Sequence, residues 1–205
     1  MQQQKEEIVK FLKNNIEPLD DNAYGPGYRA SVYLIDGTFL PCVIFRNPKI
    51  TVNLAIRRFK EEQSGTGIFK KSSGAGYYNI VKNFVVNGNC INDYDIERVE
   101  KSRYAFPLAI QQQIRGETTM GWTGFAAKMR DGKYVGFGTS FRWEFFQMPE
   151  GYSMDDIEEI VNHSYVLSTG ELRSHKVPFF NHPDDYKDAV ILRERPFFEC
   201  YIDNL

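Results

Sequence analysis

Cysteine is scarce in this sequence, and its spacing excludes two common roles. The chain has three cysteines among 205 residues, and they stand far apart at Cys42, Cys90 and Cys200. An odd number at long spacings fits neither a disulfide framework nor a zinc motif. The sequence therefore predicts a protein that needs no disulfide, metal or other cofactor, and we expect it in the reducing cytoplasm.

Long apolar runs are also missing. No stretch of the sequence approaches the ~20 apolar residues that cross a bilayer as a helix. Residues 1–15 lack the basic segment followed by an apolar core that marks a signal peptide. We therefore expect an intracellular, soluble chain with no membrane partner.

What the sequence does contain is a globular composition rich in aromatic residues. Hydrophobic residues make up 42% and charged residues 25%, close to the averages of soluble domains. A chain of this length hides roughly 70% of its unfolded surface on folding. We therefore expect one globular domain over residues 1–205.

Two Asp-Gly pairs, at 36–37 and 131–132, predict β-hairpins. Each pair stands between two runs of strand-favouring residues, and Asp-Gly suits a two-residue type I′ turn, in which both central residues take a positive φ. The runs are residues 28–35, 38–46, 118–130 and 133–147.

The two-residue turn fixes the predicted register of the first hairpin. It sets Ile35 opposite Thr38 and leaves apolar side chains on both faces, so we expect both faces to be covered. Pro41 has no N–H to donate and predicts an edge or a bulge in its strand.

In the second hairpin the same turn sets Arg130 opposite Lys133. That register pairs Phe125 with Gly138, where an aromatic ring can cover the bare backbone of a glycine.

Helices are predicted between these hairpins. Apolar residues at helical spacing predict helices over 2–15 and 51–63, with Thr51 as the cap of the second, and Ser153 is expected to cap a short third helix. Residues 96–104 and 189–202 are expected to be extended, and residues 163–177 are expected to form a third hairpin around Thr169-Gly170. These elements predict an α+β fold whose mainly antiparallel sheet is built from hairpins, with a few helices packed on it.

His163, Glu171 and His175 are the best catalytic candidates. Imidazole and carboxylate groups can exchange protons near neutral pH. A two-residue loop at Thr169-Gly170 would point the two histidines to opposite faces, whereas a three-residue loop would set His163 opposite His175. The sequence leaves both loops open, and ordinary surface histidines remain the simpler interpretation.

Positive charge gathers in residues 46–84, which carry eight Lys/Arg and two Glu. Nucleic acid could bind through residues 57–82, although Arg57 and Arg58 each stand four residues before a glutamate that would neutralise them on a helix. The Gly-rich residues 64–76 match no nucleotide-binding fingerprint, so a plain loop is favoured. The candidate anion-binding residues are Arg57, Arg58, Lys70, Lys71, Gly74 and Gly76.

Two classes of function remain. We favour a non-enzymatic binding module that presents an aromatic and locally basic surface to a protein or anionic partner, with self-association included, because Tyr, Trp and Arg anchor many interfaces. The alternative is a small hydrolase or transferase that uses the histidine cluster.

Overall fold

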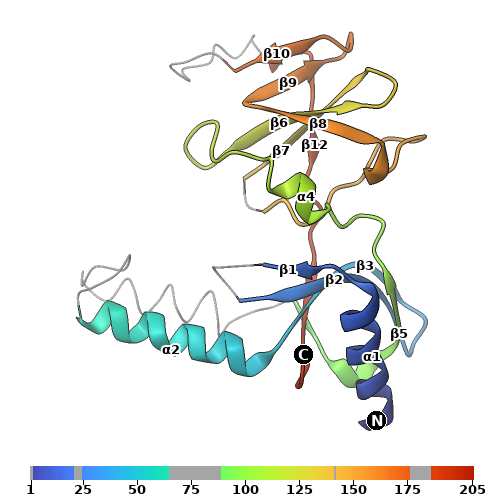
Figure 1. Ribbon diagram of the computed structural model, residues 1–205, viewed down its shortest axis with the longest axis vertical. Helices are drawn as coiled ribbons and strands as arrows, with labels where there is room; N and C mark the ends of the chain where they lie inside the picture. The colour runs from blue at the N-terminus through green and yellow to red at the C-terminus, as the bar shows by residue number, and fades with distance from the viewer. Residues whose placement is uncertain (1, 21–24, 65–88, 141, 176–185) are drawn as a thin grey trace. The chain divides into compact units, whose positions relative to one another are not determined.

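The computed structural model of the chain describes residues 2–20, 25–64, 89–140, 142–175 and 186–205 (Figure 1). The chain divides into two compact units. Unit 1 comprises Met1–Ser102 and Phe197–Leu205, and unit 2 comprises Arg103–Pro196. Each unit has its own buried apolar cluster. The single domain expected from the sequence stays a prediction.

Unit 1 combines helices with one sheet. In the part of unit 1 that the structure describes, the helical elements are α1 (Gln2–Asn15), α2 (Pro48–Ser64) and the 3-10 turn η1 (Asp93–Asp95). Its strands are β1 (Pro18–Leu19), β2 (Gly27–Leu34), β3 (Phe39–Arg46), β4 (Cys90–Ile91), β5 (Ile96–Lys101) and β13 (Phe198–Tyr201). The helix predicted over 2–15 and the strand predicted from residue 96 are confirmed.

Unit 2 is built mainly of short strands in two sheets. Its helical elements are α4 (Leu108–Gln111) and the 3-10 turn η2 (Met154–Asp156), which replaces the helix predicted after Ser153. One sheet has the order β12-β7-β6-β8 and the other β10-β9-β11. The strands are β6 (Thr123–Met129), β7 (Tyr134–Thr139), β8 (Ile157–Asn162), β9 (Ser164–Leu167), β10 (Leu172–Ser174), β11 (Ala189–Val190) and β12 (Leu192–Arg193).

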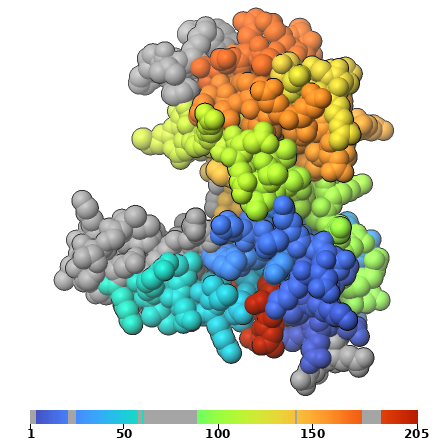
Figure 2. Space-filling view, in the orientation of Figure 1, coloured from blue at the N-terminus to red at the C-terminus, as the bar shows by residue number. Residues whose placement is uncertain are grey.

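The α+β class is confirmed, and the sheets are mixed rather than purely antiparallel. In unit 1, β2 pairs antiparallel with β1, β3 and β5. Strand β13 lies between β3 and β4 and runs parallel to both. In Figure 2 the red C-terminal residues are visible between blue and cyan residues of unit 1. In the described residues, no helix is long and apolar enough to cross a membrane.

The second helix begins earlier than predicted and has a different cap. Helix α2 starts at Pro48, and the side chain of Asn47, not Thr51, accepts the Lys49 N–H at 2.9 Å. Proline is favoured in the first helical turn, where an N–H would have no partner, and Asn is among the best caps. The periodicity located the helix body, and the local Asn-Pro chemistry set its start.

Three glycine hairpins share a three-residue loop, so the two-residue turns predicted at 36–37 and 131–132 are wrong. In these loops the N–H of Leu34 donates to Thr38 O, that of Met129 to Lys133 O and that of Leu167 to Glu171 O. A type I′ turn needs positive φ at two residues, but in each loop only the glycine has one, between 84° and 86°. The glycine is therefore the third and last residue of a three-residue loop.

The longer loop shifts the register of the first hairpin near its tip. Tyr33 pairs with Phe39, and a bulge at Pro41 and Cys42, which both face Ser31, restores the predicted register, so that Ala30 faces Val43. The bulge predicted from Pro41 is confirmed. Val43 and Ile44 are buried on opposite faces, so both faces are covered at this end of the hairpin, whereas Phe39 near its tip is exposed.

The register of the second hairpin shifts in the same way. Phe125 pairs with Phe137, not with Gly138, and Gly138 pairs with Gly124. A ring does cover Gly138, but it belongs to Trp122, whose Cζ2 would stand 2.1 Å from a Cβ at that position.

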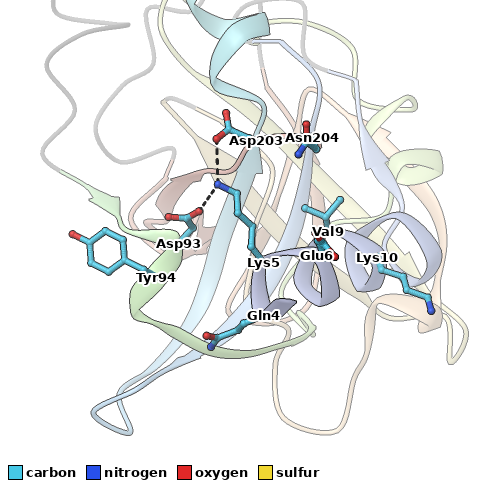
Figure 3. A pocket seen from close by; sticks show the side chains of 9 residues that line it. All are labelled: Gln4, Lys5, Glu6, Val9, Lys10, Asp93, Tyr94, Asp203 and Asn204. Carbon is cyan, nitrogen blue, oxygen red and sulfur yellow. Dashed lines mark hydrogen bonds and ion pairs between the residues drawn. The ribbon is translucent and has the colours of Figure 1, made fainter. Parts of the chain in front are cut away.

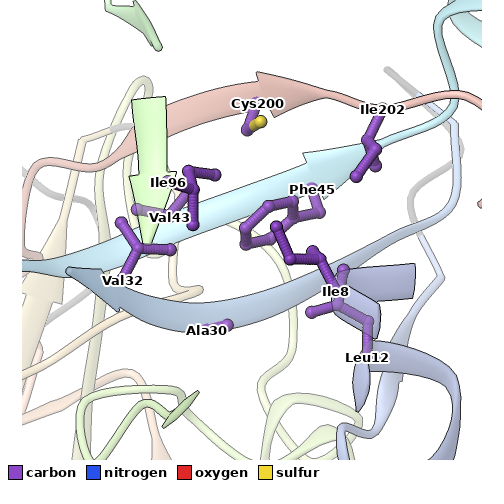
Figure 4. Packing of buried hydrophobic residues seen from close by; sticks show 9 residues of the cluster. All are labelled: Ile8, Leu12, Ala30, Val32, Val43, Phe45, Ile96, Cys200 and Ile202. Carbon is purple, nitrogen blue, oxygen red and sulfur yellow. The ribbon is translucent and has the colours of Figure 1, made fainter. Parts of the chain in front are cut away.

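The core of unit 1 lies between α1 and one face of its sheet. Ile8 and Leu12 stand one turn apart on α1 and pack against strand residues (Figure 4). Cys200 and Ile202 join them from the C-terminal segment. The core therefore needs chain segments from both ends of the sequence.

The opposite face of this sheet buries an ion pair. Arg46 is fully buried, and its Nε lies 3.3 Å from Oε1 of Glu199. The Tyr201 hydroxyl donates to Oε2 of the same carboxylate at 3.2 Å. Burial raises the pKa of Tyr201 far above its ordinary value, with the Glu199 charge acting in the same direction.

The core of unit 2 is a cluster of phenylalanines. Phe106, Phe125, Phe137 and Phe146 lie with ring centroids 5.2–6.0 Å apart. Such tilted and stacked pairs add ~0.5–1.5 kcal/mol each beyond the area that they bury.

On β6 and β7, three glycines let other chain segments approach the backbone. A Cβ on Gly136 would stand 2.6 Å from the carbonyl oxygen of Val190 and 3.2 Å from the N of Val166. Gly124 and Gly138 are covered by side chains at similarly short distances. A side chain at any of the three positions would therefore collide with its neighbours.

We expect Gly136→Ala to destabilise unit 2 by about 1–3 kcal/mol, the usual cost of overpacking, because the Val190 backbone cannot move without disturbing β11. Urea unfolding followed by tryptophan fluorescence measures this, since both tryptophans, Trp122 and Trp143, lie in unit 2.

The matched control is Gly132→Asn. Nothing lies within 4 Å of a Cβ there, and Asn tolerates the positive φ of this turn. We expect a change within about 0.5 kcal/mol. Equal losses in the two variants would contradict the steric explanation.

Candidate functional site

The structure selects the three-residue alternative for the loop at Thr169-Gly170. The His175 N–H donates to the His163 carbonyl at 2.8 Å, so the two histidines lie opposite each other beyond β10. His163 stands between β8 and β9 with a φ of 53°, a rare conformation for a residue with a side chain.

Thr118 connects His163 to the neighbouring sheet. Its buried hydroxyl lies 3.1 Å from His163 Nδ1 and accepts the N–H of Gly124 at 2.9 Å. The sequence placed Thr118 only in a polar stretch at the entrance to a strand, so this contact could not be read from it.

The ring of His175 lies on the bare backbone of Gly124. A Cβ there would stand 2.6 Å from His175 Nε2 and 3.1 Å from Trp122 Nε1. On the other side of the ring, Nδ1 lies 2.7 Å from the Tyr186 hydroxyl. Sequence reasoning missed Trp122 and Tyr186 as neighbours, because only the fold brings them to this histidine.

Glu171 is held apart from the histidines. Its carboxylate pairs with Arg173, with Nε to Oε1 at 2.8 Å, and both side chains are about half exposed. Four residues of extended chain, ~13 Å, separate Glu171 from His175. The described residues thus bring two of the three catalytic candidates together and leave the carboxylate in a surface pair. They contain no group of three or more His, Cys, Asp or Glu that could hold a metal ion.

Most of the candidate anion-binding residues lie outside the described residues, namely Lys70, Lys71, Gly74 and Gly76. Arg57 and Arg58 both belong to α2. The Arg57 side chain lines a hollow of about 470 Å³ together with Asp20, so charges of both signs meet there.

A larger hollow, of about 580 Å³, lies in unit 1 between α1, η1 and the residues after β13 (Figure 3). Its size is that of a small-molecule site. Charged residues of both signs line it: Lys5, Glu6, Lys10, Asp93 and Asp203.

Two of those carboxylates already hold an ammonium group. Lys5 Nζ lies 2.9 Å from Asp93 Oδ2 and 3.2 Å from Asp203 Oδ2. The hydrogen bond to Asp93 is the main cause that raises the pKa of Lys5. This bridge ties α1 to η1 and to the C-terminal residues, and in so exposed a setting it contributes at most ~1 kcal/mol.

The three cysteines are free and differ in exposure. Cys42 and Cys200 are buried, and burial raises the pKa of the Cys200 thiol to about 12. Cys90 is exposed, and partial burial followed by the Glu199 charge raises its pKa. None of these settings favours a reactive thiolate.

We expect Thr118→Val to destabilise unit 2 by about 1–3 kcal/mol, because the nearly isosteric valine leaves the buried Gly124 N–H without an acceptor. Thr118→Ser keeps the hydroxyl and loses one methyl group, about 0.8 kcal/mol. Urea unfolding by tryptophan fluorescence compares the two. A serine variant less stable than the valine variant would show that the hydroxyl is dispensable.

We expect a thiol reagent at pH 8 to modify native protein at Cys90 alone, and more slowly than a free cysteine because the pKa is raised. Mass spectrometry of Cys90→Ser should then find no rapid labelling, whereas all three wild-type thiols should react after denaturation. Rapid native labelling of Cys42 or Cys200 would contradict the burial described above.

Comparison of the chain with known proteins does not indicate a function. No protein-family model matches the chain, and neither a curated protein nor a solved structure matches it significantly.

Proposed function

We propose that this chain is a non-enzymatic binding module that presents an aromatic, arginine-bearing surface to a protein partner. The surface is the tip patch, which comprises Tyr33, Ile35, Phe39 and Arg98 of unit 1. The observation that carries the proposal is the exposure of two large apolar residues at the tip of one hairpin: Ile35 is 66% and Phe39 40% exposed.

Strand register aligns the tip patch across the sheet. Tyr33 on β2 pairs with Phe39 on β3 and with Arg98 on β5. Neighbouring Val32 and Leu40 pack into the core beneath α1, so the pleat turns Tyr33 and Phe39 to the opposite face.

The patch is preorganised by ring contacts. The Tyr33 and Phe39 ring centroids are 4.7 Å apart, and the Arg98 guanidinium lies 3.5 Å from the Tyr33 centroid. Arg98 also pairs with Glu100 at 3.3 Å, which leaves the patch close to neutral. Side chains already held in place lose less entropy on binding.

Apolar contact is the interaction that this patch offers. Isolated exposed apolar residues are normal, whereas a contiguous group combined with Arg and Tyr has the composition of an interface centre. Covering it would recover ~25 cal/mol for each Å² of apolar surface. The expected partner therefore carries an apolar recess that accepts Phe39 and Ile35.

The anionic partner, the cytoplasmic location and the enzyme alternative, which the sequence also suggested, have less support. Most of the basic segment 57–82 lies outside the described residues, so an anionic partner, nucleic acid included, stays a prediction. Three free thiols support the proposed cytoplasmic location. The enzyme alternative is weakened because Glu171 pairs with Arg173 instead of a histidine.

The test replaces Ile35 with a photoreactive amino acid in the native host and identifies what it crosslinks. Binding of that partner is then measured by calorimetry. We expect Ile35→Ser combined with Phe39→Ser to weaken it at least tenfold, because centrally buried anchors commonly carry ~2 kcal/mol or more.

The matched control is Val52→Ser combined with Ile56→Ser, two comparably exposed apolar residues of α2. It should leave the affinity unchanged, and circular dichroism should confirm that both variants fold. Unchanged affinity in the patch variant, or crosslinking from position 52 but not from position 35, would contradict the proposal.

A further inference from the structure

His175 is enclosed by segments that are distant in the sequence. Its ring centroid lies 5.1 Å from that of Tyr165 on β9 and 5.4 Å from that of Tyr186. Gly124 and Trp122 close the Nε2 side. The residue extends the β9–β10 pairing by one step through its backbone bond to His163.

The two ring nitrogens of His175 have unequal surroundings. Nδ1 has the Tyr186 hydroxyl at 2.7 Å, and a hydroxyl can donate or accept, so either neutral tautomer satisfies this atom. Nε2 is buried and has no hydrogen-bond partner among the described residues. Protonation makes both nitrogens donors, and the Nε2–H would then point at the Gly124 backbone with no acceptor.

The charged and titratable groups that surround the ring in the described residues do not favour a positive charge on His175. Tyr165 and Tyr186 face it, and His163 lies opposite it across the strand pair. The Arg193 guanidinium stacks 4.7 Å from the Trp122 ring centroid. Arg173 on β10 and Glu171 just before it carry opposite charges and pair with each other.

We propose that His175 is a pH-sensitive latch on the β9–β10 strand pair of unit 2. At neutral pH the uncharged ring fits between Tyr165, Tyr186 and Gly124. On acidification Nε2 carries a proton for which the described residues offer no hydrogen-bond acceptor, and the pair opens so that water can solvate the charge. A charge at the enclosed Nε2 atom without a hydrogen-bond acceptor is unfavourable, and local opening avoids it.

The direction of the pH effect follows from linkage. Burial lowers the pKa of His175 below its ordinary value of 6.5, and the His163 charge lowers this pKa further. A hydrogen bond to the Ser164 backbone acts in the opposite direction and raises it. The closed state therefore binds fewer protons than the open state. Its stability is complete above about pH 6.5 and is lost as the pH falls through the depressed pKa.

The test is an NMR titration of the three histidines together with hydrogen exchange in residues 164–174. We expect His175 to titrate below 6.5. Protection factors, corrected for intrinsic exchange rates, should fall up to roughly tenfold per pH unit over the range in which only the open form is charged.

His175→Phe keeps an aromatic ring that cannot be protonated and should remove this pH dependence. His163→Gln, at the opposing exposed position, should retain it. If the phenylalanine variant fails to fold, the wild-type titration still decides. A His175 pKa at or above 6.5, an unchanged pH dependence in His175→Phe, or its loss in His163→Gln would overturn the latch.

Discussion

In unit 2 the backbone of one sheet approaches the backbone of another, which is possible only where side chains are absent. Gly136 meets the main chain of Val166 and Val190, and the rings of Trp122 and His175 fill the space over the adjoining glycines. Interiors are packed too densely to absorb even one additional methyl group at such a contact. The positions of Trp122 and His175, and with them the candidate site, depend on these bare backbones.

Local chemistry made much of the secondary structure predictable. The spacing of Ile8, Phe11 and Leu12 located the first helix, and glycine located the hairpin loops at Gly37, Gly132 and Gly170. Pro41 correctly indicated a bulge, because a missing N–H acts on the chain wherever the strand lies. Loop length was missed, since Asp-Gly serves two-residue and three-residue loops alike. The additional loop residue pairs Phe39 with Tyr33, whereas the predicted register would pair it with Leu34.

Long-range pairing could not be predicted in the same way. The parallel placement of β13 between β3 and β4 depends on contacts across more than a hundred residues, and no turn signal records them. The candidate site shows the same limit. The facing histidines were one of two stated alternatives. The contact of His175 with the Gly124 backbone and the contact of Thr118 with His163 form only when separate strands meet.

Strand β13 also constrains the order of events during biosynthesis. It occupies the interior of a sheet whose other strands precede residue 102, yet the ribosome makes it after all of residues 103–196. Unit 2 can close as soon as it emerges, because its strands are contiguous in the chain. Unit 1 must wait with a vacant strand position and an uncovered apolar face, an interval in which chaperone binding or pairing with another nascent chain competes with correct folding.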